Sequence, residues 1–71
     1  MLSPTDSCRD RLAAFYHWGD RQSLTVAAWI AIRNRVSFPT LRRWSAGEGM
    51  TDRFEEFLAE IGRVRRRAAP G

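Results

Sequence analysis

The chain has 71 residues, among them 12 basic residues, 8 acidic residues, one cysteine and one histidine. A chain this short forms one domain and buries only about 60% of its unfolded surface. A single cysteine excludes an internal disulfide, and Cys8 with His17 offers too few soft ligands for a zinc site. The net charge is +4 and all 12 basic residues are arginines, which favours an acidic partner such as nucleic acid.

Several other classes of protein lack their signals in this sequence. No stretch reaches the ~20 apolar residues of a membrane helix, and the N-terminus lacks the basic and apolar regions of a signal peptide. We therefore expect no membrane contact and a cytoplasmic location. The chain also lacks a carboxylate pair, a nucleophile beside a base, a glycine-rich phosphate loop and metal-ligand spacing. We expect no enzyme, no cofactor, no metal and no small-molecule ligand.

The first predicted helix begins near Ser3. This residue can cap the helix, and Pro4 suits its first position. Gly19 is suited to end it, because glycine readily adopts the left-handed backbone that often follows a helix. Apolar side chains recur three and four residues apart and mark one face of the helix: Leu12, Phe15 and Tyr16.

A loop over residues 19–23 precedes the second predicted helix, which Ser23 or Thr25 can cap. Its central run, residues 26–32, is apolar on every side. Such a run also fits a buried strand, but its three alanines favour a helix. No second strand of matching character exists to pair with it. Residues 26–32 are therefore predicted to be helical.

The third predicted helix lies in the stretch RVSFPTLRRW, residues 35–44. Ser37 can cap it, and Pro39 fits its first turn, where a missing N–H costs little. The end is marked by Ser45 and Gly47. A helix in this register points two apolar side chains inward and two adjacent arginines outward, respectively Leu41 with Trp44 and Arg42 with Arg43.

The fourth predicted helix begins at Thr51, and its apolar positions form a clean amphipathic stripe: Phe54, Phe57, Leu58 and Ile61. We expect Gly62 to end or fray it. Residues 63–71 are basic and finish in helix breakers, so we expect a frayed or disordered tail after a domain of residues 1–62. The predicted fold class is all-α, a compact domain of four to five helices without a β-hairpin wing.

Spaced residues lie across the turn between the second and third predicted helices and along the third helix: Ala31, Val36, Ser37, Thr40, Leu41, Trp44 and Gly47. With this pattern the two helices and their turn resemble the helix-turn-helix of the Cro/C1-type (lambda-repressor-like) DNA-binding family. The resemblance covers roughly residues 8–61. Where the family usually has a glycine in the turn, this chain has Arg35 preceded by Asn34, which leaves the register of the turn open between these two residues.

The resemblance implies which side chains would face DNA. Arginine can hold guanine O6 and N7 with two hydrogen bonds, and phosphate contacts position a protein without discriminating bases. The positions that correspond to base contacts are Ser37, Phe38, Pro39, Arg42 and Arg43. The positions expected to contact phosphates are Thr25, Arg33, Arg35 and Thr40.

The function that the resemblance implies is sequence-specific regulation of transcription. The protein would be a small Cro-like repressor of phage, plasmid or antitoxin type, acting in a bacterial or phage-infected cell. It would bind double-stranded DNA as a homodimer on a pseudo-palindromic operator, with half-sites about 10 bp apart. A regulatory protein partner would also be compatible with this function.

The apolar second helix leaves one face without an obvious internal cover, and such patches usually mark interfaces. We expect a dimer or partner interface there or on the fourth helix, unless the first helix and the tail wrap this face. The residues proposed for it are Trp29, Ile32, Phe54 and Phe57.

Two alternative functions remain open at this point. The protein is a protein-interaction module if its apolar second helix, rather than the arginine pair, makes the essential contact. An excisionase- or MerR-like winged helix would share a run similar to residues 36–44 but needs a β-hairpin soon after it. Residues 50–61 have a helical pattern, so we rank this alternative lower.

Overall fold

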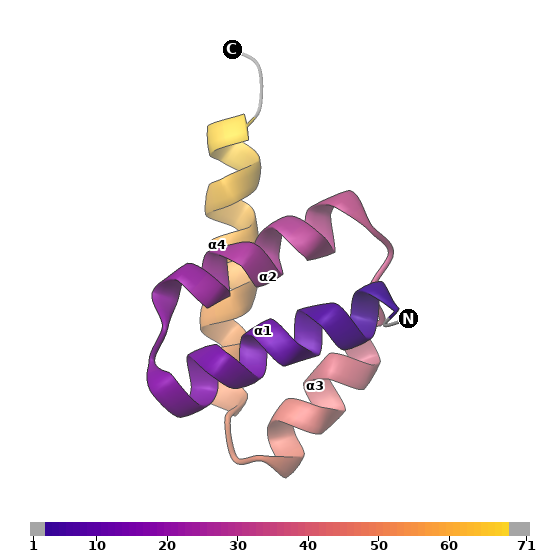
Figure 1. Ribbon diagram of the computed structural model, residues 1–71, viewed down its shortest axis with the longest axis vertical. Coiled ribbons are helices and arrows are strands. Elements are labelled where there is room, and N and C mark those ends of the chain that lie inside the picture. Colours follow the sequence, from indigo (N-terminus) through magenta and orange to yellow (C-terminus); the bar gives the residue numbers. More distant parts are fainter. Residues whose placement is uncertain (1–2, 69–71) are drawn as a thin grey trace.

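A computed structural model describes residues 3–68 of the chain, and within that range the fold consists of four helices and contains no strand (Figure 1). The helices are α1 (Pro4–Trp18), α2 (Arg21–Arg33), α3 (Phe38–Gly47) and α4 (Thr51–Ala68). The all-α prediction is confirmed. Residues 51–61, where a winged helix would have its β-hairpin, form the first three turns of α4.

The helix starts follow from local capping. The Ser3 hydroxyl accepts a hydrogen bond from the Asp6 N–H at 3.1 Å, as predicted. At α2 the cap is Asp20 instead of Ser23 or Thr25, because the Asp20 carboxylate accepts from the N–H groups of Gln22 and Ser23 at 3.0 and 3.3 Å. The second helix therefore begins earlier than predicted, at Arg21.

The helices pack around one core, with α1 in the middle of the view in Figure 1. α2 runs antiparallel to α1 after the turn at Gly19, whose φ is 66°. α4 crosses α2, and α3 lies on the opposite side of α1 from α2. The residues that fill the centre are all apolar and almost fully buried: Cys8, Leu12, Phe15, Leu24, Ala27, Ala28, Leu41, Phe54 and Phe57.

The prediction that the fourth helix ends at Gly62 is wrong. α4 continues to Ala68, and Val64 is buried with only 4% of its surface exposed. Val64 lies three residues after Ile61, so it extends the apolar stripe by another turn and holds the chain in helical form. Residues 63–68 are therefore part of the domain, whereas residues 69–71 lie outside the described range.

Phe54 and Phe57 do not form an interface, contrary to the prediction. They are 1% and 0% exposed, and their rings lie 5.8 Å apart in the core. A periodic apolar stripe predicts that one face of a helix is buried. It does not show whether the core of the domain or a partner protein covers that face. Here the core buries it.

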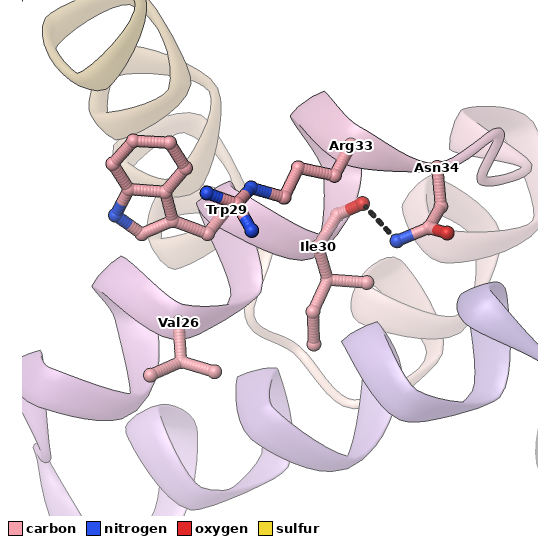
Figure 2. Close-up of a pocket in the computed structure, with 5 residues that line it drawn as sticks. All are labelled: Val26, Trp29, Ile30, Arg33 and Asn34. Atoms are coloured by element: carbon pink, nitrogen blue, oxygen red, sulfur yellow. Dashed lines mark hydrogen bonds between the residues drawn. The ribbon is translucent and has the colours of Figure 1, made fainter. Parts of the chain in front are cut away.

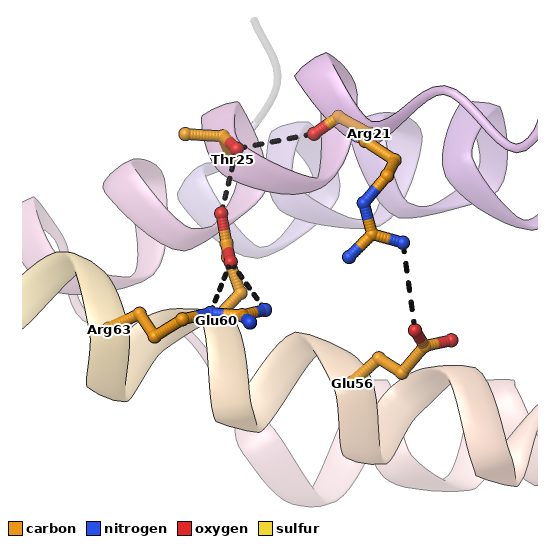
Figure 3. Close-up of polar contacts among 5 residues, drawn as sticks. All are labelled: Arg21, Thr25, Glu56, Glu60 and Arg63. Atoms are coloured by element: carbon orange, nitrogen blue, oxygen red, sulfur yellow. Dashed lines mark hydrogen bonds and ion pairs between the residues drawn. The ribbon is translucent and has the colours of Figure 1, made fainter.

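A group of polar contacts joins the outer sides of α2 and α4 (Figure 3). Arg21 lies 3.7 Å from the Glu56 carboxylate, and Arg63 lies 2.8 Å from that of Glu60. Thr25 donates its hydroxyl hydrogen to the same Glu60 carboxylate at 2.8 Å. A phosphate at Thr25 would meet this negative charge, which argues against the phosphate contact predicted there.

Candidate nucleic-acid interface on α3

The buried face of α3 fixes its position. Leu41 and Ser45 are both 0% exposed. The hydroxyls of Ser45 and Tyr16 lie 2.7 Å apart and share a hydrogen bond, and Trp44 stacks on the Tyr16 ring with centroids 5.3 Å apart. α3 is thus attached to α1 by a buried polar pair and an aromatic stack. The sequence marks Ser45 only as part of the helix end, so this role of its hydroxyl is visible only in the structure.

The opposite face of α3 carries the two adjacent arginines. Both Arg42 and Arg43 are exposed, as the helical register predicted. The Arg42 guanidinium carbon lies 5.4 Å from the centre of the Phe54 ring, so this side chain leans back over the junction with α4. A cation at this distance from an aromatic face is attracted by about 0.5–1 kcal/mol at exposed sites. Arg43 extends from the solvent side of the helix.

The first turn of α3 brings the other predicted base-contact residues to the same helix. Ser37 is the N-cap, and its hydroxyl lies 2.7 Å from that of Thr40. The Ser37 N–H donates to the Thr5 hydroxyl at 3.0 Å, which ties this end of α3 to the start of α1. Pro39 is exposed, and Phe38 is 37% exposed with its ring 6.3 Å from Phe57.

The connection between α2 and α3 differs from the tight turn that was expected. Asn34 has an extended backbone, with φ −134° and ψ 161°, and only glycines have a positive φ within residues 3–68. The connection therefore carries the chain away from α2 towards the far side of α1 (Figure 1). α2 packs mainly against α1 and α4. α3 contacts these same two helices, through the Tyr16–Ser45 hydrogen bond to α1 and the Phe38–Phe57 ring pair with α4.

The predicted phosphate-contact residues other than Thr25 are exposed. Thr40 lies in the first turn of α3, and Arg35 lies in the connection that leads to it. Arg33 lies in the last turn of α2, with its guanidinium carbon 5.1 Å from the centre of the Trp29 ring. Arg33 is therefore part of a different surface from Arg42 and Arg43, and the structure does not bring all the predicted contacts together.

The proposed interface residues on α2 behave differently from those on α4. Trp29 is 37% exposed, and Ile32 is half-buried against the core. Trp29 also lines an open pocket of about 400 Å³ together with Val26, Ile30, Arg33 and Asn34 (Figure 2). This pocket was not predicted as such, although the surplus of apolar residues in the second helix signalled it.

Within the part of the chain that the structure describes, Cys8 and His17 do not form a catalytic or metal-binding site. Cys8 is fully buried, and its thiol lies 3.5 Å from the Ala27 carbonyl oxygen. Burial raises the pKa of the Cys8 thiol to about 12, so it stays protonated at neutral pH and does not provide a thiolate nucleophile. His17 is exposed in the last turn of α1. Across residues 3–68, no three side chains of the metal-binding types cluster together.

Comparisons with known proteins returned no matching family model, no matching curated protein and no matching solved structure. The case for a function therefore rests on the geometry and charge of this chain. None of the four helices between residues 3 and 68 has the length and apolar character needed to cross a membrane.

Proposed function

We propose that the protein is a small double-stranded DNA-binding regulator of transcription and that α3 is the helix that contacts the bases. The observation that carries the proposal is the division of α3 into two faces. Leu41 and Ser45 are fully buried, whereas Arg42 and Arg43 are exposed side by side. A helix that enters the major groove needs such an anchored face and such a polar one.

The chemistry of the exposed face fits base edges. An arginine guanidinium can hold guanine O6 and N7 with two hydrogen bonds, and such a pair discriminates by about 1–3 kcal/mol against the wrong base. The Arg42 guanidinium carbon lies 5.4 Å from the centre of the Phe54 ring, and a side chain held by such a contact would lose less entropy on binding. The partly exposed Phe38 would contact a thymine methyl group.

The charge of the rest of the molecule supports attraction to a phosphate backbone. The net charge is +4, and Arg35 is exposed just before α3. Further exposed arginines follow in the last turns of α4, at Arg65, Arg66 and Arg67. These groups would increase affinity for any duplex and its salt dependence without selecting a sequence.

Regulation by such a protein would follow from occupation of an operator. A homodimer bound to a pseudo-palindrome, with half-sites about 10 bp apart, would place one α3 in each of two successive major grooves. A Cro-like repressor of phage, plasmid or antitoxin type is the form of regulator that the sequence resemblance suggests. This arrangement requires a contact between two copies of the chain, which is part of the proposal.

The proposal is tested by replacing Arg42 and Arg43 with glutamine and measuring duplex binding by fluorescence anisotropy. We expect affinity for a selected duplex to fall at least tenfold, because two charge-assisted contacts are lost. The matched control is the double variant Arg9→Gln and Arg11→Gln, which removes the same charge from exposed sites on α1. Equal losses in the two double variants would contradict a specific role for α3.

A further inference from the structure

The open pocket on α2 is a second surface, separate from α3. Its lining residues Val26, Trp29, Ile30 and Arg33 are spaced at i, i+3, i+4 and i+7, so they form one stripe along the helix (Figure 2). The inner face of α2 is covered, since Leu24, Ala27 and Ala28 are buried against α1 and α4. The stripe is thus the apolar face of α2 that the fold leaves partly open to solvent.

The stripe combines an apolar surface with one positive charge. Trp29 is 37% exposed, and within residues 3–68 Trp18 is the one large apolar residue that is more exposed. The Arg33 guanidinium lies over its ring at 5.1 Å. Asn34 completes the pocket, and its side-chain N–H donates to the Ile30 carbonyl at 3.2 Å. No carboxylate lines the pocket. An occupant that supplies both an apolar side chain and a carboxylate would match this surface.

Other occupants fit less well. A second copy docked on the same stripe would supply no carboxylate to pair with Arg33, because none lines the pocket. A single-stranded nucleic acid needs free aromatic faces and several cations along its backbone. Here Arg33 already covers a face of the Trp29 ring and is the one cation that lines the pocket.

We infer that the Val26–Trp29–Ile30–Arg33 stripe docks an acidic, apolar peptide segment of another protein. A bulky apolar side chain of the peptide would enter the pocket against Trp29 and Ile30, and an adjacent Asp or Glu would pair with Arg33. The pocket volume of about 400 Å³ is sufficient for one or two side chains of this kind. This inference goes beyond DNA binding and does not depend on it.

The test uses a phage-displayed library of random 12-residue peptides, selected on the full chain and counter-selected on the Trp29→Gln variant. The expected result is enrichment of peptides in which Leu, Ile, Phe or Trp neighbours Asp or Glu. An enriched peptide is then synthesised and titrated by fluorescence anisotropy. Binding should weaken at least tenfold on Trp29→Gln and on Arg33→Glu, while Arg9→Glu, an equal charge change at an exposed site on α1, should bind as before.

Exchanging the charges of the peptide and of residue 33 tests the pairing by a gain of binding, which an unfolded variant could not produce. The same peptide with its acidic residues changed to lysine should bind Arg33→Glu more tightly than it binds the unmodified chain. The inference is overturned if no peptide is enriched over the Trp29→Gln counter-selection, or if basic peptides are enriched. It is also overturned if sedimentation shows a dimer that Trp29→Gln dissociates, or if a 15-residue oligothymidylate binds and Trp29→Gln abolishes that binding.

Discussion

At the scale of single residues, the contact that places α3 is the hydrogen bond between the Tyr16 and Ser45 hydroxyls. The two oxygens are 2.7 Å apart, and the residues are 5% and 0% exposed. Burial raises the pKa of Tyr16, so the phenol stays neutral and the pair is a bond between two neutral hydroxyls. A buried hydroxyl without a partner is costly, whereas removing both members of the pair is not.

This contact predicts a non-additive pair of substitutions. Tyr16→Phe and Ser45→Ala should each lower the free energy of unfolding by about 1–3 kcal/mol, because each leaves the other hydroxyl buried and unpaired. The double variant should lose less than the sum of the two single losses. Urea denaturation of the three variants provides the measurement. Strictly additive losses would show that the two hydroxyls do not interact.

At the scale of helices, the sequence predicted where most helices lie but not where all of them begin and end. Periodic apolar residues located α1, α3 and α4. The cap of α2 was assigned to Ser23 or Thr25 because several residues of a capping type follow one another there, and only the contacts of Asp20 distinguish among them. Glycine has a weak helix propensity, which favours a helix end at Gly62, but the buried Val64 extends the apolar stripe past it.

The continuation of α4 through Gly62 leads to a stabilising substitution. A Cβ at Gly62 would meet no atom within 4 Å. Gly62→Ala should therefore raise the free energy of unfolding by about 0.4–1 kcal/mol, because alanine loses less backbone entropy in a helix. The control is Gly19→Ala: there is equal space, but φ is +66°, a conformation that alanine adopts only with strain. Thermal unfolding should move in opposite directions for the two variants.

The polar contacts between α2 and α4 predict a pH dependence of stability. The hydrogen bond from Thr25 and the nearby Arg63 lower the pKa of Glu60 below its usual 4.5, and the Ser23 hydrogen bonds lower the pKa of Asp20 below its usual 3.8. A carboxyl whose pKa is lower in the folded state stabilises the fold above its unfolded pKa and loses that contribution as the pH falls through the folded value. The stability should therefore decrease as the pH falls below about 4.5.

Glu60→Gln separates this carboxylate from the other acidic residues. The variant should be less stable than the unmodified chain at pH 7, and the difference should shrink on acidification as Glu60 becomes protonated. Urea denaturation at pH 7, 5 and 3 measures both. A difference that stays constant with pH would mean that the Glu60 charge contributes nothing and that only the geometry of the side chain matters.

At the scale of the whole molecule, the sequence pattern of each helix predicted which of its residues are exposed. It did not predict which helices pack against one another. Exposure of Arg42 and Arg43 followed from the register of one helix, and the structure confirms it. The burial of Phe54 and Phe57 in the core, and the support of α3 by α1, depend on contacts between distant segments. The extended backbone at Asn34 leads the chain from α2 towards α3, and no residue type in the connection requires that conformation.

The arrangement separates two surfaces, with exposed arginines on α3 and the apolar stripe on α2. The central claim is that the first of these contacts specific bases. The most direct measurement is selection of binding sites from a random duplex pool at ~150 mM salt, where phosphate attraction alone is weakened. The unmodified chain should enrich a two-fold symmetric motif, and the Arg42→Gln, Arg43→Gln variant should enrich none. A pool that stays random with the unmodified chain, or one that the double variant enriches equally, would contradict the central claim.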